Sequence, residues 1–181
     1  MTSQPPMVKS EEATLEDLEF ARQQGQAYVR ALEHMVNDVA DGGGEKEVGD
    51  VIVAYANEPA EGLYYYEDDE LKWREPLPSE VHIEVSVRDA GDNRFIPGLH
   101  VEVTVEDKFG VEIDTQQHPF LWHPWLHHYG RNWEIPKDGE YNLIIHVSPG
   151  PFIRHDKKNG RRFTEPVEVR FDGVHLKTVE A

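Results

Sequence analysis

The residues best suited to chemistry lie between Gln117 and Gly130, a segment that holds four of the ten histidines and two of the four tryptophans. Imidazole is the commonest metal ligand among side chains, and an ordinary solvent loop has no need of so many. Pro119 and Pro124 exclude a regular helix or a central strand here. Part of this segment is therefore expected to form one wall of a transition-metal site. The alternative is an aromatic loop that packs over a β core.

A second group of polar side chains lies on residues 81–88, where apolar and polar residues alternate. His82 and Glu84 are separated by one residue, so both side chains project from one strand face, with Cα atoms about 7 Å apart. An imidazole and a carboxylate at one point suit a metal ion, although the polar face of any edge strand can carry such a pair. The pair indicates a metal site only if other ligands converge on it.

Two further histidines are candidates to converge on this pair. His128 precedes Tyr129-Gly130, a turn able to fix the direction of its ring, and His155 lies in the long charged loop 152–160. Loops at the end of a sandwich are where such residues can meet. Three imidazoles and one carboxylate suit copper, iron or zinc, and among divalent ions the affinity is expected to be greatest for copper.

The composition excludes several other kinds of site. The chain has 181 residues, no cysteine and a formal net charge of -17. Disulfides, thiolate zinc sites, cysteine nucleophiles and blue copper centres are therefore excluded. With 35 acidic and 18 basic residues, the chain repels phosphate backbones, so nucleic acid is not an expected partner.

No apolar run approaches the about 20 residues that span a bilayer. The start lacks the features of a secretory signal, so two expectations stay open: the protein works in the cytoplasm, or a signal has been removed from the chain as written.

One helix is predicted before the candidate ligands. Apolar residues recur at three- and four-residue steps from Thr14 to about Ala40, with Thr14 as the N-cap and Asp17 at the capping-box position. Gly25 is expected to weaken this helix, and the glycines after Asp41 are expected to end it. The predicted organisation is a disordered lead-in over 1–13, a helix and glycine linker over 14–44, and a metal-binding β-sandwich over 45–181.

Beyond the glycines the apolar period changes from 3.6 to 2, as in strands. Short strands are predicted over residues 51–55, 62–66, 81–88, 99–106, 111–114, 131–135, 141–147, 165–171 and 174–179. The first two are expected to be joined by a turn at 57–60. Eight to ten short strands at hairpin spacing predict an all-β fold, a β-sandwich with one additional N-terminal helix.

Short motifs follow one another in a fixed order between Val81 and Phe171, which is about half of the chain. They are His82-Ile83-Glu84, His128-Tyr129-Gly130 followed by Asn132, Gly139-Glu140-Tyr141-Asn142-Leu143 leading to Ser148-Pro149, Arg154-His155, and Glu165-Pro166. In order and spacing this segment resembles the periplasmic iron-transport accessory proteins, the small copper- and iron-binding β-sandwich proteins of bacterial high-affinity iron uptake. The resemblance implies an immunoglobulin-like sandwich, a homodimer, a periplasmic location, and a copper and iron site of three histidines and a methionine with a glutamate nearby.

The resemblance assigns individual ligands. Carried over to this chain, it makes His82, His128 and His155 the imidazole ligands and Glu84 the carboxylate. The methionine does not carry over: it would fall near Phe120 or Leu121, and the only methionines are Met1, Met7 and Met35. Loss of a thioether makes a site harder and shifts its preference from Cu(I) toward Cu(II), Zn(II) or iron. His118 or His123 is expected to supply the missing fourth ligand, and His118 is the favoured one.

The function expected from these residues is that of a metal carrier or accessory protein in iron or copper handling. Its expected partners are the metal ion and a membrane iron permease or reductase. A closed four-ligand site stores or transfers metal, whereas an open position is needed for catalysis. Two alternatives stay open. One is a non-haem metalloenzyme that uses His82, Glu84 and His128, and the other is a metal-free interaction module that uses the aromatic loop 118–133.

Overall fold

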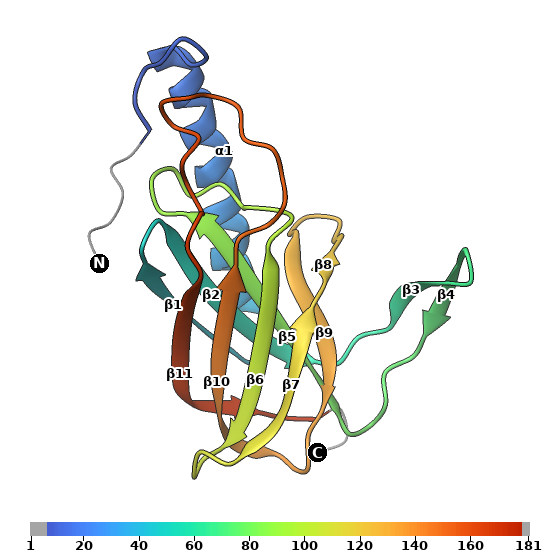
Figure 1. The fold of residues 1–181 in the computed structure, drawn as a ribbon. Coiled ribbons are helices and arrows are strands. Elements are labelled where there is room, and N and C mark those ends of the chain that lie inside the picture. The colour runs from blue at the N-terminus through green and yellow to red at the C-terminus, as the bar shows by residue number, and fades with distance from the viewer. Residues whose placement is uncertain (1–6, 179–181) are drawn as a thin grey trace.

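Two facing antiparallel sheets form the body of the protein (Figure 1). The computed structural model describes residues 7–178, which contain eleven strands and one helical segment. The five-stranded sheet has the order β1-β2-β5-β9-β8 and the four-stranded sheet the order β11-β10-β6-β7. Their bounds are β1 Gly42–Val48, β2 Val51–Pro59, β5 Glu80–Asp89, β6 His100–Asp107, β7 Glu112–His118, β8 Phe120–Leu121, β9 His128–Glu134, β10 Gly139–Ser148 and β11 Val167–Leu176. The predicted immunoglobulin-like sandwich with one N-terminal helix is confirmed.

Alternating apolar side chains fill the space between the two sheets. From β5 the core receives Val81, Ile83, Val85 and Val87, none of which is exposed to solvent. Opposite them lie side chains of the four-stranded sheet: Val101, Val103, Val105, Leu143 and Ile145. Burying each such side chain stabilises the fold by about 1.5–3 kcal/mol. Because β5 alternates with period two, its polar side chains are turned to the opposite face of the five-stranded sheet, called the outer face below.

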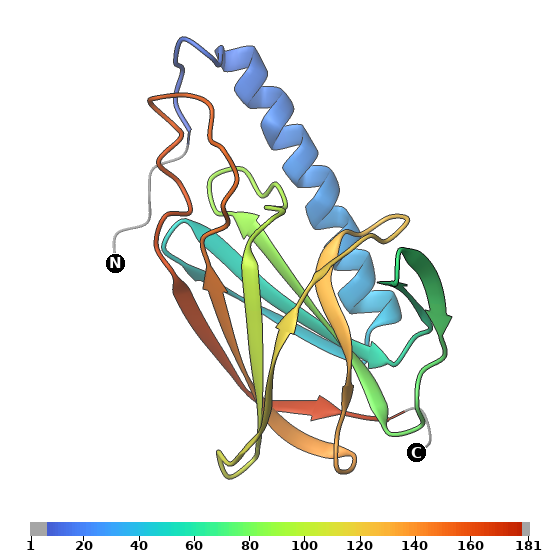
Figure 2. The same ribbon diagram turned by 45° about the vertical axis from the view of Figure 1, so that its right-hand side comes forward.

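A helix covers the outer face (Figure 2). Helix α1 spans Leu15–His34 and continues as a π-helical turn over Met35–Val39. It begins with the predicted capping box, in which Thr14 and Asp17 bond each other's backbone N–H. At its other end Met35 packs with Ala56 of β2 and with Leu126. The outer face is thus buried under apolar residues of the helix, and its polar side chains are removed from solvent.

Gly25 lets α1 make a close contact with the turn after β5, whereas the sequence suggested that this glycine would weaken the helix. A Cβ atom at Gly25 would lie 1.7 Å from the carbonyl oxygen of Asp92, in the turn after β5. Only glycine lets the helix backbone approach that turn so closely. The local cost in helix propensity is offset by the packing of α1 against the sheet.

The glycine run expected as a linker is part of the sheet, which corrects the predicted boundary at residue 44. Gly42, Gly43 and Gly44 form the first half of β1 and pair with Asn57, Ala56 and Tyr55 of β2. A Cβ atom at Gly43 would lie 3.0 Å from a Val36 side-chain carbon. Glycine here lets the end of the helix lie directly on an edge strand.

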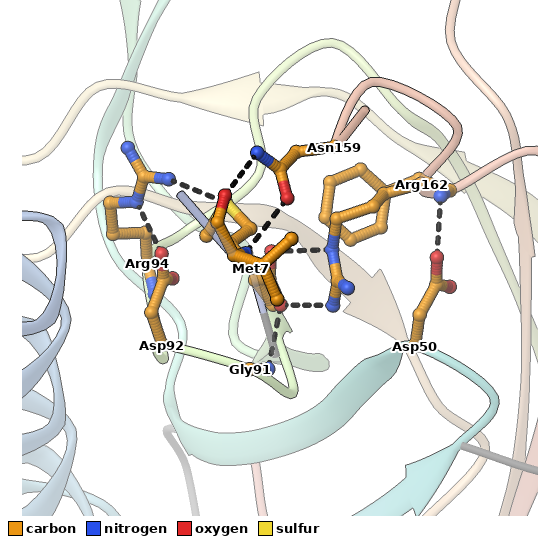
Figure 3. Close-up of polar contacts among 10 residues, drawn as sticks. Met7, Asp50, Gly91, Asp92, Arg94, Asn159 and Arg162 are labelled. Atoms are coloured by element: carbon orange, nitrogen blue, oxygen red, sulfur yellow. Dashed lines mark hydrogen bonds and ion pairs between the residues drawn. The ribbon is translucent and has the colours of Figure 1, made fainter. Parts of the chain in front are cut away.

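The chain before α1 is attached to the loop between β10 and β11. Of the lead-in predicted over 1–13, residues 1–6 lie outside the described part of the chain. In the remainder, Asn159 bonds both backbone groups of Val8, each at 2.9 Å, and Ser10 donates to Asp156. Figure 3 shows Met7, Arg94 and Asn159 gathered at this junction. The N-terminal segment and the β10–β11 loop therefore form one layer beside the start of α1.

A small hairpin projects from the body of the protein (Figure 1). Its strands are β3, Leu63–Glu67, and β4, Glu70–Arg74, and they pair only with each other. The predicted turn at 57–60 is wrong, because β2 continues through it to Pro59 and pairs with β5 instead of β3. In the described residues no helix combines the length and apolar character needed to cross a bilayer.

Candidate metal centre

Three buried side chains meet on the outer face. His82 and Glu84 project from β5, and His128 projects from the neighbouring strand β9. Each is less than 5% exposed, and their ligand atoms all lie within 4.8 Å of one another. The Nε2 atom of His128 lies 3.2 Å from Oε1 of Glu84, and Nε2 of His82 lies 4.0 Å from the same oxygen. Bonds of about 2.0–2.2 Å from a zinc-sized ion to N and O ligands put those ligands about 3 Å apart, so this spacing suits a metal ion.

Both imidazole rings are held with Nε2 toward the centre of the cluster. The Nδ1–H of His82 donates to Oδ1 of Asn132 at 2.7 Å, and the amide of Asn132 is fixed by its own bond to the carbonyl of Glu61. The Nδ1–H of His128 donates to the carbonyl of Leu126 at 2.8 Å. With the proton on Nδ1, each Nε2 keeps a free lone pair, as a metal ligand must. Accordingly, Nε2 of His128 is buried without a hydrogen-bond partner.

Gly130 leaves the space that an ion would fill. It lies on β9 directly opposite Glu84. A Cβ atom at this position would lie 3.0 Å from Nε2 of His128 and 3.0 Å from Nε2 of His82. The two lone pairs thus point into a hollow that exists only because residue 130 has no side chain. The residues present therefore fit a metal ion.

Burial keeps the cluster uncharged when no ion is bound. It lowers the pKa of the His128 imidazole to about 3 and also lowers the pKa of His82. Burial and the neighbouring carboxyl of Glu58 raise the pKa of Glu84, and these two carboxyls share a hydrogen bond. A proton therefore stays on the carboxyl pair at neutral pH, while the imidazoles are neutral. A divalent cation would displace that proton and gain two neutral nitrogen ligands.

Sequence reasoning missed three residues that shape this centre: Glu58, Gly130 as a spacer, and Asn132 as an orienting group. Each is a cross-strand neighbour of a ligand, since Glu58 and Asn132 both pair with His82 and Gly130 pairs with Glu84. A glycine inside a strand was a usable signal, because it often marks a close approach. The identities of the neighbours depend on strand register, which the sequence does not reveal.

His118, the favoured fourth ligand, is not in the cluster. It ends β7 and pairs with Val101, so its ring is turned into the sandwich core. There its Nε2 accepts a 2.8 Å hydrogen bond from Nε1 of Trp133, and burial lowers the pKa of the ring to about 3. The five-stranded sheet separates this histidine from the outer face, so the structure places it as a core residue.

His155 is also far from the cluster. Its side chain is 84% exposed and lies 3.3 Å from Glu12, just before the start of α1. The cluster lies under the other end of the helical segment, near Met35 and Ala56. Since a 20-residue helix is about 30 Å long, one copy of the chain does not bring His155 to the other ligands.

Two residues of the loop, His123 and Leu121, lie at the edge of the cluster. The ring of His123 lies 5.9 Å from that of His128, and its Nδ1 accepts from the backbone N–H of Leu126 at 3.3 Å. Leu121 on β8 pairs with His128, and the resemblance expected a methionine near Leu121 or its neighbour Phe120. His123 is therefore nearer to the ligands than His118, and Leu121 replaces a sulfur ligand by an apolar side chain.

A cavity connects the cluster with the surface. It has a volume of about 350 Å³ and lies between α1 and the outer face, with Glu84 and His128 in its wall. Other lining residues include Glu33 and the ion pair of Glu45 with Arg88, so the wall carries charged as well as apolar side chains. The cavity gives an ion a route to Glu84 and His128 that does not require the sheet to open.

Comparisons with known proteins agree with this fold. A family model described as Fe2+ transport protein matches residues 68–175, more than half of the chain. FetP of uropathogenic Escherichia coli strain F11 has a similar structure, with a TM-score of 0.57 and 20% identity over 74% of this chain and 95% of FetP. The copper-reconstituted P19 protein of Campylobacter jejuni matches with a TM-score of 0.56 and 19% identity over 73% of this chain and 94% of P19. A comparison with curated protein sequences finds no match.

At these identities the two solved structures show a shared fold, and the family model carries the assignment. The match of that model covers β5, which holds His82 and Glu84, and β9, which holds His128. The helix α1 and strands β1 and β2 lie before the matched segment. The chain belongs to the Fe2+ transport protein family.

Proposed function

We propose that this protein is a metal-binding accessory of iron transport that holds a divalent transition-metal ion with His82, Glu84 and His128. The observation that carries the proposal is the convergence of two unprotonated Nε2 atoms and one carboxylate oxygen on a hollow above Gly130. The hydrogen bonds at both Nδ1 atoms hold the rings in that orientation before an ion arrives. A pre-oriented set of this kind binds an ion without refolding the sheet.

Copper is the ion we expect to bind most tightly. Two imidazoles and a carboxylate favour Cu2+ over Zn2+ and Fe2+ in the usual order of divalent affinities. FetP and P19 have both been solved with copper, which supports the same choice here. Iron is then the weaker-binding cargo of the same three ligands, in keeping with the family to which the chain belongs.

Metal analysis tests this proposal directly. Protein purified without chelator and loaded with copper, iron or zinc is expected to retain one ion per chain, and His82→Ala is expected to lose it. His100→Ala is a matched control, because His100 is exposed on β6 and outside the cluster. Failure of the parent protein to retain any of the three ions would contradict the proposal.

A metalloenzyme is a second candidate, favoured by the ligand count. The cluster contains two histidines and one carboxylate, the set that non-haem iron oxygenases use, and the cavity beside it reaches Glu84 and His128. Oxygen consumption by the Fe2+-loaded protein, in the presence and absence of added reductant, separates the two candidates. A carrier is expected to give no turnover beyond one equivalent of oxidised iron per site.

We also propose that the protein forms a homodimer and works outside the cytoplasm beside a membrane permease or reductase. The exposed position of His155 supports the first part, because the ligand role that the resemblance gives His155 would require a site on a second copy. Metal titration of His155→Ala, combined with analytical ultracentrifugation, tests it. Weaker metal binding that accompanies an intact dimer would support a shared site, and unchanged binding would assign the ion to one copy alone.

The exposed aromatic side chains of the loop 118–133 support a partner surface near the centre. Trp122 is 70% exposed and Trp125 is 43% exposed, on the same loop that leads to His128. A partner docked there would lie beside the cluster. Cross-linking in membranes of the source cell, with and without Trp122→Ala, tests this surface.

A further inference from the structure

We propose that Met35 supplies a thioether as the fourth ligand, so that the N-terminal helix completes the metal centre. Met35 lies at the junction of α1 and the π-helical turn, before the segment that the family model matches. The inference rests on the proposed metal function. It adds one ligand, which comes from the N-terminal helix, an element that sequence patterns would place outside the site.

The register of α1 along β5 brings Met35 to the cluster. The hydroxyl of Tyr28 donates to Oγ of Ser86 at 3.1 Å, which fixes one point of the helix over the strand. Met35 follows seven residues later, about 10 Å farther along the helix axis. Along β5, Glu84 is about 7 Å from Ser86 and His82 about 14 Å. Met35 therefore lies over the part of the strand that carries the two ligands, provided that the helix runs in that direction.

The packing of Met35 shows that the helix does run that way. Met35 packs in one cluster with Ala56 and Leu126. Ala56 is the cross-strand partner of Glu84, and the carbonyl of Leu126 holds the ring of His128. The side chain of Met35 is 2% exposed, so it lies between these neighbours and beneath the helix. Met35 therefore lies on the helix side of the outer face, in contact with the neighbours of two of the three ligands.

The backbone supports a specific role for this position. The hydrogen bond from Ala40 N–H to the Met35 carbonyl, 2.8 Å long, skips four residues and opens the helix into a π-helical turn that starts at Met35. Such turns are rare and are frequently found at functional sites. After this turn the chain enters β1, the edge strand of the sheet that carries the cluster.

A thioether ligand would change what the centre does. Two imidazoles, one carboxylate and one thioether make a closed set of four, and the soft sulfur raises the affinity for Cu(I) relative to zinc and iron. A closed set also favours a carrier over an oxygen-activating enzyme, since no position stays open for substrate. The helix would thus replace the sulfur ligand that Leu121 on β8 does not provide.

X-ray absorption at the copper edge tests the inference. The chain has no cysteine, so any sulfur bound to copper must come from a methionine. Cu(I)-loaded protein is expected to show one sulfur scatterer, and in protein labelled with selenomethionine that scatterer is expected to become selenium. Met35→Leu is expected to lose the scatterer. It is also expected to weaken Cu(I) binding at least about 10- to 100-fold, the loss in metal affinity that removal of a supporting group causes.

A matched control separates ligation from packing. Met7→Leu changes the other methionine of the described residues, whose sulfur accepts from Arg94 far from the cluster, and it is expected to leave the copper spectrum unchanged. A shell of nitrogen and oxygen only, in the unlabelled and labelled parent protein alike, would overturn the role of Met35 while leaving the three-ligand site intact. Absence of bound copper would overturn the proposed function itself.

Discussion

At the scale of single residues, Gly130 determines whether the cluster can hold an ion. Its missing side chain is the space between two Nε2 atoms, each 3.0 Å from the place that a Cβ would take. Gly130→Ala is therefore expected to abolish metal binding. It is also expected to lower the free energy of unfolding, because its Cβ would lie 2.9 Å from Cδ2 of the buried His128 ring. Isothermal titration with Cu2+ measures the first effect, and urea unfolding measures the second.

Gly42→Ala is the matched control for this substitution, because Gly42 lies in a strand of the same sheet and does not line the cavity beside the cluster. It is expected to bind Cu2+ as the parent protein does. Tight copper binding by Gly130→Ala would show that the ion does not occupy the hollow above residue 130.

Asn132 acts on the metal through His82. Its side-chain oxygen accepts the Nδ1–H of that ring at 2.7 Å and so selects the tautomer whose Nε2 faces the cluster. Asn132→Ala is expected to weaken metal binding about 10- to 100-fold, as loss of an outer hydrogen-bond partner does. Competition with a chromophoric chelator measures the affinity. Asn142→Ala, in the other sheet, is the control: it also removes a bond to a backbone carbonyl, and an equal loss of affinity there would argue against an orienting role for Asn132.

At the scale of elements, alternation along one strand was enough to predict part of the site. The pattern over residues 81–88 placed His82 and Glu84 on one face, and the structure has them there. His128 was a candidate from its place before Tyr129-Gly130, the resemblance made it a ligand, and it lies on the adjacent strand. The sandwich and the capped helix were likewise predictable, because both depend on local periodicity and on a capping box.

Residues whose positions depend on strand pairing could not be predicted. His118 precedes Pro119, where the chain passes from one sheet to the other, and only the pairing of β7 with β6 decides that its ring faces the core. The direction of the β10–β11 loop, and with it the position of His155, depends on contacts with the N-terminal segment. The covering of the outer face by α1 is also a long-range contact, so nothing in the sequence linked Met35 to Glu84.

The β10–β11 loop is anchored by a buried ion pair. Arg162 donates to both carboxylate oxygens of Asp89, at 3.0 and 2.5 Å, and both side chains are less than 10% exposed (Figure 3). Arg162→Ala would leave the Asp89 carboxylate buried without this partner, at a cost of about 3–5 kcal/mol in the free energy of unfolding. Urea unfolding measures this change. The loop is distant from the cluster, so copper affinity below the unfolding transition is expected to stay unchanged.

Arg170→Ala is the control for the buried pair, because Arg170 bonds Glu106 and Asp172 at the surface of the four-stranded sheet. Exposed pairs contribute little, so this variant is expected to unfold close to the parent protein. If Arg162→Ala were equally harmless, the loop would have to be held mainly by its other contacts.

At the scale of the whole molecule, the buried cluster couples metal binding, folding and pH. In the absence of metal, the raised pKa of Glu84 means that the folded state keeps a proton that the unfolded chain loses above about pH 4.5. This contribution to the free energy of unfolding is therefore complete at low pH and falls as the pH rises through the raised pKa. His128 acts in the opposite direction between its folded pKa of about 3 and its ordinary value of 6.5. Above pH 6.5 only the carboxyl pair still binds protons differently in the folded and unfolded states. The free energy of unfolding without metal is therefore expected to decrease toward alkaline pH.

Bound metal reverses this trend, because the ion must displace the proton of the carboxyl pair. Between pH 6.5 and 9, copper affinity is expected to rise with pH, and the gap in Tm between copper-loaded and metal-free protein is expected to widen. The change is at most about 1.4 kcal/mol per pH unit for each proton released. Calorimetric titration in buffers of different ionisation enthalpy counts those protons. Glu84→Gln has no proton to displace at this position, so it is expected to bind metal more weakly and with a flatter dependence on pH. An equally steep dependence in Glu84→Gln would place the displaced proton on another group and would remove Glu84 from the ligand set.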